Sequence, residues 1–310
     1  MTDDSSLKPT EGESASKRLR RRGFLSTAAA TLGGTFAAST PSAASESGGR
    51  SDLGGVPTAA FDGNQWSLSW SDEFNQGYVD ESVWSFETGN GHAQGIPGWG
   101  NNELQYYQRE NAWVENDHLV IEAREEQVSD QYGSYDYTSA RMKTQGGYNK
   151  QYGRVDVRAR LPEGQGLWPA IWALGSDIDS AGWPDCGEID IMELTGDDTD
   201  TVHGTVHGPG YSGGNSIGGT YNNGSFADAY HTFQLTWYPD AIKFFVDGNH
   251  YFTVTLYGVE DAGNEWVFDD GPFFFLLNVA VGGNLPGAPD ATTQFPQRME
   301  VDYVRVYDWV

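Results

Sequence analysis

The sequence has a single cysteine, few lysines and no long apolar run after its first residues. The one cysteine, Cys186, excludes an intramolecular disulfide, so the core must supply the stability of the fold. We interpret Cys186 as a small buried apolar residue and not as a nucleophile. No segment after residue 44 approaches the roughly 18 consecutive apolar residues of a membrane-spanning helix, so no membrane segment is expected there.

Positive charge is also scarce. The 310 residues carry a net charge of −26, and residues 45–310 have 12 Lys and Arg against 40 Asp and Glu, a net charge of −28. Such a field repels phosphate backbones and anionic lipids, so neither nucleic acid nor a membrane surface is expected as a partner. Few lysines and abundant aspartate resemble the balance in halophilic proteins, where salt screens like-charge repulsion. The alternative is an ordinary acidic secreted protein.

Residues 1–44 have the order of a secretion signal. The run Arg20-Arg21-Arg22-Gly23-Phe24-Leu25 precedes a mildly apolar stretch from Leu25 to Ala38, and small residues follow at Ser42-Ala43-Ala44. The arginine pair before Gly-Phe-Leu resembles a twin-arginine signal, which predicts secretion after folding. The alternative is a basic N-terminal arm. Residues 45–60 are predicted to be a flexible linker, and residues 61–310 a single large domain.

Glycine and aromatic residues are abundant. The chain contains 40 Gly and 11 Trp, and 14% of its residues are aromatic, which favours a turn-rich β protein over a helical one. Asp247-Gly248 predicts a tight hairpin turn, and the run from Phe273 to Val281 is apolar on both faces. Two-residue alternation predicts further strands at His118 to Arg124, Gly153 to Leu161, Thr232 to Tyr238, Ile242 to Val246 and Met299 to Tyr307. The pattern predicts an all-β fold, an antiparallel β-sandwich of jelly-roll type.

Three acidic residues, Glu188, Asp190 and Glu193, lie among apolar residues in the segment GEIDIMEL. In a regular strand, Glu188 and Asp190 share one face and Glu193 points to the other. One site can use all three only if a β-bulge near Ile191-Met192 absorbs an extra residue. With that bulge, Glu188 and Glu193 come onto one face, near the ~5–5.5 Å separation of the two carboxyl groups in a retaining glycosidase.

Neighbouring carboxylates raise one another's pKa, because like charges repel. One of them can stay ionised as a nucleophile while another keeps its proton as a general acid. Asp190, which lies between the glutamates in sequence, can hydrogen-bond to the nucleophile, and the group is expected to titrate as a coupled unit. The alternative is a solvated acidic edge strand in an acidic protein.

The segment GEIDIMEL resembles the active-site signature of glycoside hydrolase family 16 in its laminarinase-like form, E-x-D-x-x-E. Further blocks resemble the family from Trp66 to the C-terminus: GWGNNELQYYQ, HLVIEARE, YTSARMKTQGGYNKQYGRVDVRARLPEGQGLWPAIWALG, FFLLNVAVGGNLPGAPD and MEVDYVRVYD. The resemblance implies that residues 61–310 are a catalytic domain, a concanavalin-like jelly roll with a cleft on its concave face. It also implies retaining endohydrolysis of β-1,3-containing glucans, with a β-glucan polysaccharide as partner.

The resemblance also implies roles for single residues. Glu188 is the expected nucleophile, Asp190 its assistant and Glu193 the acid/base. The expected substrate-binding residues are Trp168 and Trp172 as sugar platforms, Trp183 as a wall, Asn102 and Arg141 as hydrogen-bonding groups, and His207 as the active-site histidine. Core packing is the alternative for the two platforms. Arg141 can instead be a structural partner for an acidic neighbour.

No cofactor is expected for catalysis. A structural calcium ion is implied on the convex side, with oxygen ligands from Glu73, from the backbone near Asp117 and from Asp302. Two other functions stay open: a non-catalytic β-glucan-binding lectin on the same sandwich, and the same fold acting on another polysaccharide such as lichenan or agarose. The complete acid set favours the hydrolase over the lectin, and the protein is expected to be secreted and monomeric.

Overall fold

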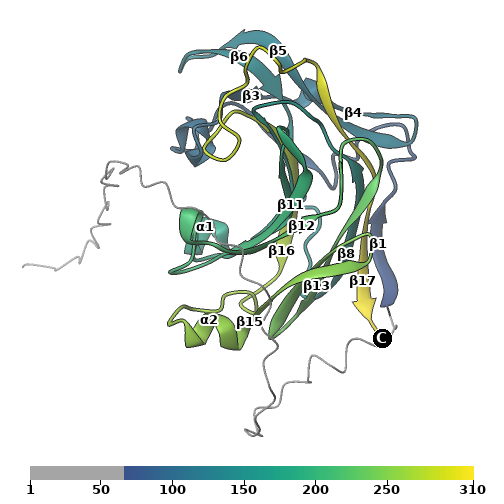
Figure 1. The fold of residues 1–310 in the computed structure, drawn as a ribbon, viewed down its shortest axis with the longest axis vertical. Coiled ribbons are helices and arrows are strands. Elements are labelled where there is room, and N and C mark those ends of the chain that lie inside the picture. The colour runs from purple at the N-terminus through teal and green to yellow at the C-terminus, as the bar shows by residue number, and fades with distance from the viewer. Residues whose placement is uncertain (1–65) are drawn as a thin grey trace, which may run out of the picture. The chain divides into compact units, whose positions relative to one another are not determined.

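A computed structural model describes residues 66–310 of the chain (Figure 1). The predicted signal segment, the linker and the first residues of the predicted domain lie outside the described residues. In the described part, two β-sheets stack face to face, and two short helices, α1 (Ile178–Ala181) and α2 (Leu256–Asp261), lie in connections between strands. Short 3-10 turns span Pro97–Gly100, Arg109–Asn111 and Gly213–Asn215. Within this part, none of the helices is both long and apolar enough for a membrane span.

The strands form one sheet of seven and one of ten. The seven-stranded sheet has the order β12 (Ile217–Asn222), β11 (Asp198–His207), β10 (Glu188–Thr195), β9 (Leu167–Gly175), β16 (Phe273–Val281), β7 (Arg141–Lys143) and β2 (Ser85–Glu87). The ten-stranded sheet has the order β15 (Asn249–Thr255), β14 (Ala241–Val246), β13 (His231–Tyr238), β8 (Gly153–Arg160), β17 (Gln297–Trp309), β5 (His118–Ser129), β6 (Ser134–Ser139) and β3 (Gln105–Tyr107). In addition, β1 (Trp66–Asp72) pairs with β17, and β4 (Ala112–Glu115) pairs with β5.

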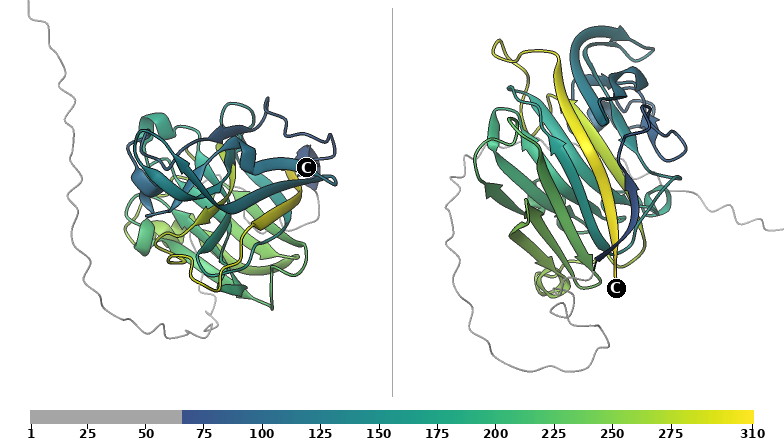
Figure 2. Two further views of the ribbon diagram at one scale, coloured as in Figure 1. Left: turned by 90° about the horizontal axis from the view of Figure 1, so that it is seen from above. Right: turned by 90° about the vertical axis from the view of Figure 1, so that its right-hand side faces the viewer.

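The arrangement confirms the predicted all-β jelly-roll sandwich. The strand pairs are antiparallel apart from the short pair of β3 with β6. Figure 2 shows β17, in yellow, in the middle of the ten-stranded sheet. The seven-stranded sheet bends so that the face turned away from the second sheet is concave (Figure 1). We call this face the concave face.

One hydrophobic cluster fills the space between the two sheets. Ile189 and Ile191 of β10 meet there with side chains of the other sheet such as Val157 of β8 and Phe244 of β14, and all of these are at most 2% exposed. The strand β16 is buried along its whole length, as its continuous apolar run predicts. The burial of alternate residues on β10 therefore leaves its other face for polar side chains.

The predicted turn and strands agree closely with the structure. Asp247 and Gly248, with φ of 50° and 76°, connect β14 to β15 and place Val246 opposite Asn249. One predicted boundary is wrong by several residues: the strand expected to end at Arg124 continues to Ser129. The polar extension, residues 125–129, pairs with β6. Local sequence does not reveal this partner.

The strand β10 contains the predicted bulge. Two residue steps from Asp190 to Met192 match a single step on β9, and the register with β11 shifts over the same segment. Ile191 and Met192 are consecutive, yet both are buried, at 2% and 0% exposure. The extra residue brings Glu193 onto the face that carries Glu188, which confirms the geometry required for a shared site.

Cys186 is buried, at 3% exposure, in a small cluster with Leu174, Phe274 and Leu276. Burial, followed by the negative charge of Glu188, raises the pKa of its thiol to about 12. Because the thiolate and not the thiol is the nucleophilic form, this environment agrees with the interpretation of Cys186 as a small apolar residue.

We predict that Ile191→Ala and Met192→Ala each lower the free energy of unfolding by about 2–5 kcal/mol, because each removes a side chain buried in the core. In a regular strand, one of two consecutive residues points outward and its truncation costs little. Thr195→Ala, at the partly exposed end of β10, is the control and should change stability by about 0.5 kcal/mol or less. Urea unfolding measures all three, and wild-type stability of either core variant would contradict the bulge.

Candidate active site

The three acids of β10 lie on the concave face. Asp190 is 4% exposed, and the Glu188 side chain is 16% exposed. The register places His207 of β11 directly opposite Glu188, and Trp172 of β9 opposite Asp190. The alternative of a solvated acidic edge strand is wrong, because β10 lies between two hydrogen-bonded neighbours and its acids are largely buried.

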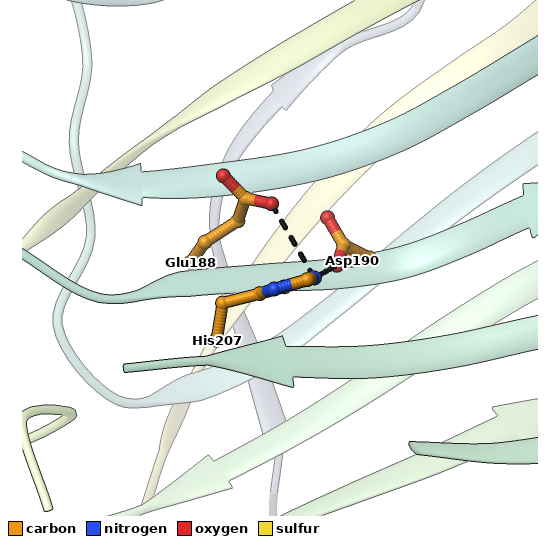
Figure 3. A group of neighbouring side chains, drawn as sticks. All are labelled: Glu188, Asp190 and His207. Atoms are coloured by element: carbon orange, nitrogen blue, oxygen red, sulfur yellow. Dashed lines mark ion pairs between the residues drawn. The ribbon is translucent and has the colours of Figure 1, made fainter. Parts of the chain in front are cut away.

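His207 joins two of the acids into one cluster (Figure 3). Its Nε2 lies 3.0 Å from Asp190 Oδ2 and 3.6 Å from Glu188 Oε1. On the other side of the ring, Nδ1 accepts a hydrogen bond of 3.1 Å from the backbone N–H of Gly213. Because Nδ1 accepts, the neutral ring carries its proton on Nε2, which faces the carboxylates. The Nε2 side of His207 thus faces this acid pair, although Asp190 Oδ2 itself has no hydrogen-bond partner among the described residues. The same three residues form a group of potential metal ligands, but the Nε2 proton leaves no lone pair on that nitrogen for a metal.

Two indole N–H groups each serve one glutamate. Trp168 Nε1 donates to Glu193 Oε1 at 3.0 Å, and Trp183 Nε1 donates to Glu188 Oε2 at 3.0 Å. Trp168 comes from β9, whereas Trp183 lies in the loop after α1 and is 48% exposed. The structure therefore brings two of the three predicted tryptophans into contact with the acids. Each indole contacts one carboxylate oxygen of its glutamate, and the other oxygen of Glu188, Oε1, faces His207 at 3.6 Å.

Trp172 lies on the same face of β9 as Trp168, as their equal parity predicts. Its Nε1 donates to Asn278 Oδ1 at 2.7 Å, and its ring packs partly on the small cluster around Leu174. Both tryptophans are half-buried on the concave face, so core packing between the sheets does not explain them. Their action as sugar platforms stays a prediction.

Arg141 has partners within the protein. Its Nε lies 2.7 Å from Glu87 Oε2, and its guanidinium lies between the rings of Trp99 and Trp172, at 4.6 and 4.7 Å from their centroids. This environment agrees with the interpretation of Arg141 as a structural partner of an acidic neighbour. Asn102, with a φ of 59°, donates from Nδ2 to Asn284 Oδ1 at 2.8 Å on the exposed rim. Direct substrate contacts of Arg141 and Asn102 stay predictions.

A buried polar network behind Trp172 was not predicted. Tyr107 Oη accepts from Asn278 Nδ2 at 3.2 Å and donates to Glu103 Oε2 at 3.1 Å. Gln105 Nε2 donates to the same Glu103 oxygen at 2.6 Å. Burial raises the pKa of Glu103, opposed chiefly by the nearby charge of Arg141. The spacing of Glu103, Gln105 and Tyr107 in alternate positions is the signal that could have found them, because it puts three polar side chains on one strand face.

The environment of the acids raises their pKa values. Burial is the largest cause for Glu188, Asp190 and Glu193, and the pKa of each is raised to about 8. The charge of Asp190 raises the values of both glutamates further, while His207 opposes the rise. The hydrogen bond from Trp168 also lowers the pKa of Glu193. The cluster therefore retains protons at pH values where exposed carboxyl groups are ionised.

The residues predicted to bind calcium have other partners. Glu73 accepts hydrogen bonds of 2.9 and 2.8 Å from Arg305, and Asp302 forms an ion pair with Arg158. Asp117 lies in the turn between β4 and β5 with a φ of 60°. Arginines thus pair with the side chains of Glu73 and Asp302. The calcium site, which also needs a backbone oxygen near Asp117, stays a prediction.

The sequence profile described as "Glycosyl hydrolases family 16" matches residues 99–305. The chain belongs to this family. A β-glucanase of Rhodothermus marinus is 44% identical over 260 residues, which cover 79% of this chain and 86% of that protein. The crystal structure of the laminarinase catalytic domain of Thermotoga maritima is 57% identical, with a TM-score of 0.78 over 79% of this chain and 99% of that one. The endo-β-1,3-glucanase of Pyrococcus furiosus is 53% identical, with a TM-score of 0.79 over 81% and 97% of the two chains.

The membership confirms the laminarinase-like resemblance of the sequence. As a family 16 protein, the chain is a retaining glycoside hydrolase, and the reaction of this family needs no catalytic cofactor. The matched residues include β10 with its three acids and β9 with its two tryptophans.

We predict that Asp190→Asn stabilises the protein increasingly as pH rises. The folded-state pKa of Asp190 is raised from 3.8 to about 8, so the wild type loses stability between these pH values, where the unfolded chain has released a proton that the folded one retains. The neutral amide avoids this loss, and we expect a gain of about 1–3 kcal/mol at pH 8 relative to pH 4. Urea unfolding across this pH range measures it. Glu260→Gln on the exposed face of α2 is the control, and a pH-independent difference for Asp190→Asn would contradict the prediction.

Proposed function

We propose that this family 16 hydrolase is an endo-acting β-glucanase that cleaves internal β-1,3 bonds, in pure β-1,3 or mixed β-1,3/1,4 glucans, and acts as a monomer. The observation that carries the proposal is the bulged strand β10, which puts Glu188 and Glu193 on one face, each with its own indole donor. The names of the similar proteins, a β-glucanase and two β-1,3-glucan hydrolases, agree with this substrate class.

In the first half of the reaction, Glu193 donates a proton to the glycosidic oxygen as its bond to C1 breaks. The Glu188 carboxylate attacks C1 from the opposite face and forms a glycosyl ester. Because the pKa values of both glutamates are raised to about 8, the step uses the form of the coupled pair in which Glu193 holds the proton and Glu188 is ionised. Trp183 holds Glu188 Oε2, so Glu188 Oε1 is the oxygen that attacks.

In the second half, Glu193 acts as a base. It takes a proton from a water molecule whose oxygen attacks C1, and the ester bond breaks to release Glu188 as a carboxylate. Two inversions at C1 give net retention. Asp190 and His207, whose Oδ2 and Nε2 atoms lie 3.0 Å apart, adjust the charge beside Glu188 while Glu188 passes from anion to ester and back.

The glucan lies on the concave face in this proposal. Trp168 and Trp172 offer half-buried indoles on which the C–H faces of glucose units pack, and Trp183 closes one side. Asn102 on the rim contributes hydrogen bonds to hydroxyl groups. Agarose or another polysaccharide on the same fold is less favoured, because the similar proteins named above are glucanases.

We predict that Glu188→Ala lowers turnover of laminarin by at least about 10³-fold while laminari-oligosaccharides still bind, because only the nucleophile is removed. Azide should restore cleavage of an activated glycoside by Glu188→Ala and give an α-configured glycosyl azide. Reducing-end release and NMR of the products measure these outcomes, and Glu260→Gln is the control with wild-type activity. A wild-type product of inverted configuration would contradict the mechanism.

The alternative of a non-catalytic lectin is not favoured. It would use the same tryptophans without hydrolysis, but it has no need for three acids whose pKa values are raised together. In the laminarin assay, tight binding by the wild type without any product would favour the lectin.

We also propose that the protein works in high salt. Residues 45–310 carry 40 acids against 12 Lys and Arg. Several of these arginines are already engaged in ion pairs on the ten-stranded sheet: Arg124, Arg158, Arg160 and Arg298. The remaining negative field is screened by salt. The laminarin assay is therefore run at low and at molar NaCl, and the higher rate is expected at molar NaCl.

We propose secretion by the twin-arginine pathway, on the basis of the sequence of residues 1–44. Replacing Arg21 and Arg22 together by Lys should stop export, because the pathway reads the arginine pair and not the charge alone. Replacing Arg18 and Arg20 by Lys makes the same chemical change outside the pair and should leave export intact. Activity in the medium and in the cells of a host with this pathway measures the outcome. Undiminished export of the Arg21/Arg22 variant would contradict the proposal.

A further inference from the structure

Trp168 is held between Glu193 and a loop far away in sequence. Its Nε1 donates to Glu193 Oε1 at 3.0 Å. The far edge of its ring, at Cζ3 and Cε3, lies against Gly283 in the loop after β16, where a Cβ built on the glycine would stand only 3.1 and 3.2 Å away. Such distances are shorter than optimal carbon contacts. The absence of a side chain at Gly283 therefore lets the indole reach its hydrogen bond with Glu193.

The loop at 282–284 is tied to its surroundings. The backbone N–H of Gly282 donates to Gly166 O at 2.7 Å, directly before β9, and the N–H of Asn284 donates to Asn101 O at 2.8 Å. Asn102 Nδ2 adds a side-chain bond of 2.8 Å to Asn284 Oδ1. Because these hydrogen bonds hold the loop from two sides, they resist its movement away from Trp168.

From this geometry we infer that Gly283 and Asn284 are positioning residues for Glu193. They keep Trp168 in the position from which its Nε1–H donates to Glu193 Oε1. The inference rests on the proposed role of Glu193 as acid/base. With Oε1 occupied, Oε2 is the oxygen that passes the proton to the glycosidic oxygen and later takes a proton from water. The loop acts on the reaction through Trp168 and does not act on the substrate itself.

A displaced Trp168 impairs proton donation selectively. The sugar alkoxide that leaves from laminarin needs a proton, whereas a dinitrophenolate leaves without one. The value of kcat/KM compares free enzyme and substrate with the transition state. A misplaced Glu193 therefore lowers kcat/KM for laminarin far more than for a dinitrophenyl β-laminaribioside. A general defect of folding or binding lowers both values alike.

The first test compares two glycines of one loop. Both glycines have a positive φ, 116° at Gly283 and 72° at Gly287. Gly283→Ala introduces a Cβ that meets Trp168, whereas the Cβ of Gly287→Ala meets only Gln165 Nε2, at 3.5 Å. We expect Gly283→Ala to lower kcat/KM for laminarin by about 10–100-fold, and that for the dinitrophenyl glycoside by about threefold or less. Gly287→Ala should change both by about threefold or less. Trp168→Phe, which keeps a ring but removes the N–H, should reproduce the selective loss.

The second test uses Asn284, whose φ is not positive, so that backbone strain is avoided. Asn284→Ala removes the acceptor for Asn102 Nδ2, while Asn284→Asp keeps one. The alanine variant should show the selective loss on laminarin, by about 3–10-fold, and the aspartate variant should restore it. The hydrogen bond from Trp168 lowers the pKa of Glu193, so Gly283→Ala and Trp168→Phe should also move the basic limb of the laminarin pH profile to higher pH.

The inference would be overturned if Gly283→Ala lowered kcat/KM equally for laminarin and for the dinitrophenyl glycoside. It would also be overturned if the ratio of these two kcat/KM values stayed as in the wild type in Gly283→Ala or in Asn284→Ala. If Gly283→Ala does not fold, the Asn284 pair decides. Failure of the proposed function is distinct, because the wild-type protein would then turn over neither laminarin nor the dinitrophenyl glycoside.

Discussion

One extra residue in β10 is the constraint on which the site depends. Without it, Glu193 would share the face of Ile189 and point into the core between the sheets. The bulge turns this residue to the concave face and compensates by sending both Ile191 and Met192 into the core. Catalytic geometry and packing are thus two results of the same backbone irregularity. The apolar residues of GEIDIMEL are as necessary to the site as its acids.

The buried acids are unfavourable to the fold, and the surrounding donors reduce that penalty. Burial raises the pKa values of all three acids to about 8, which means that the folded state resists ionising them. Each glutamate receives one indole N–H, and His207 faces Asp190 with the nitrogen that carries its proton. His207 opposes the rise for both glutamates, and the hydrogen bond from Trp168 opposes it for Glu193.

The sequence contains most of the information about the strands and little about how loops meet. Asp247-Gly248 and the run from Phe273 to Val281 predict their structures because turn chemistry and two-sided burial are local properties. The contact of Asn102 with Asn284 joins residues 182 positions apart, and no spacing rule connects them. The stack of Arg141 between two indoles and the close contact of Gly283 with Trp168 are likewise tertiary. The arginine partners of Glu73 and Asp302, two of the predicted calcium ligands, likewise come from distant positions in the chain.

The two glutamates receive their indoles from different kinds of support, one a strand and the other a loop. Trp168 belongs to a strand paired on both sides and is wedged by a tethered loop. Trp183 lies in a loop, and nearly half of it is exposed. In the proposed mechanism, Glu193 gives up a proton and later takes one back, so it gains from a carboxylate held in one place, whereas Glu188 becomes an ester and must accommodate a bond to C1 that forms and breaks. The strand-borne indole thus serves the proposed acid/base, and the loop-borne indole serves the proposed nucleophile.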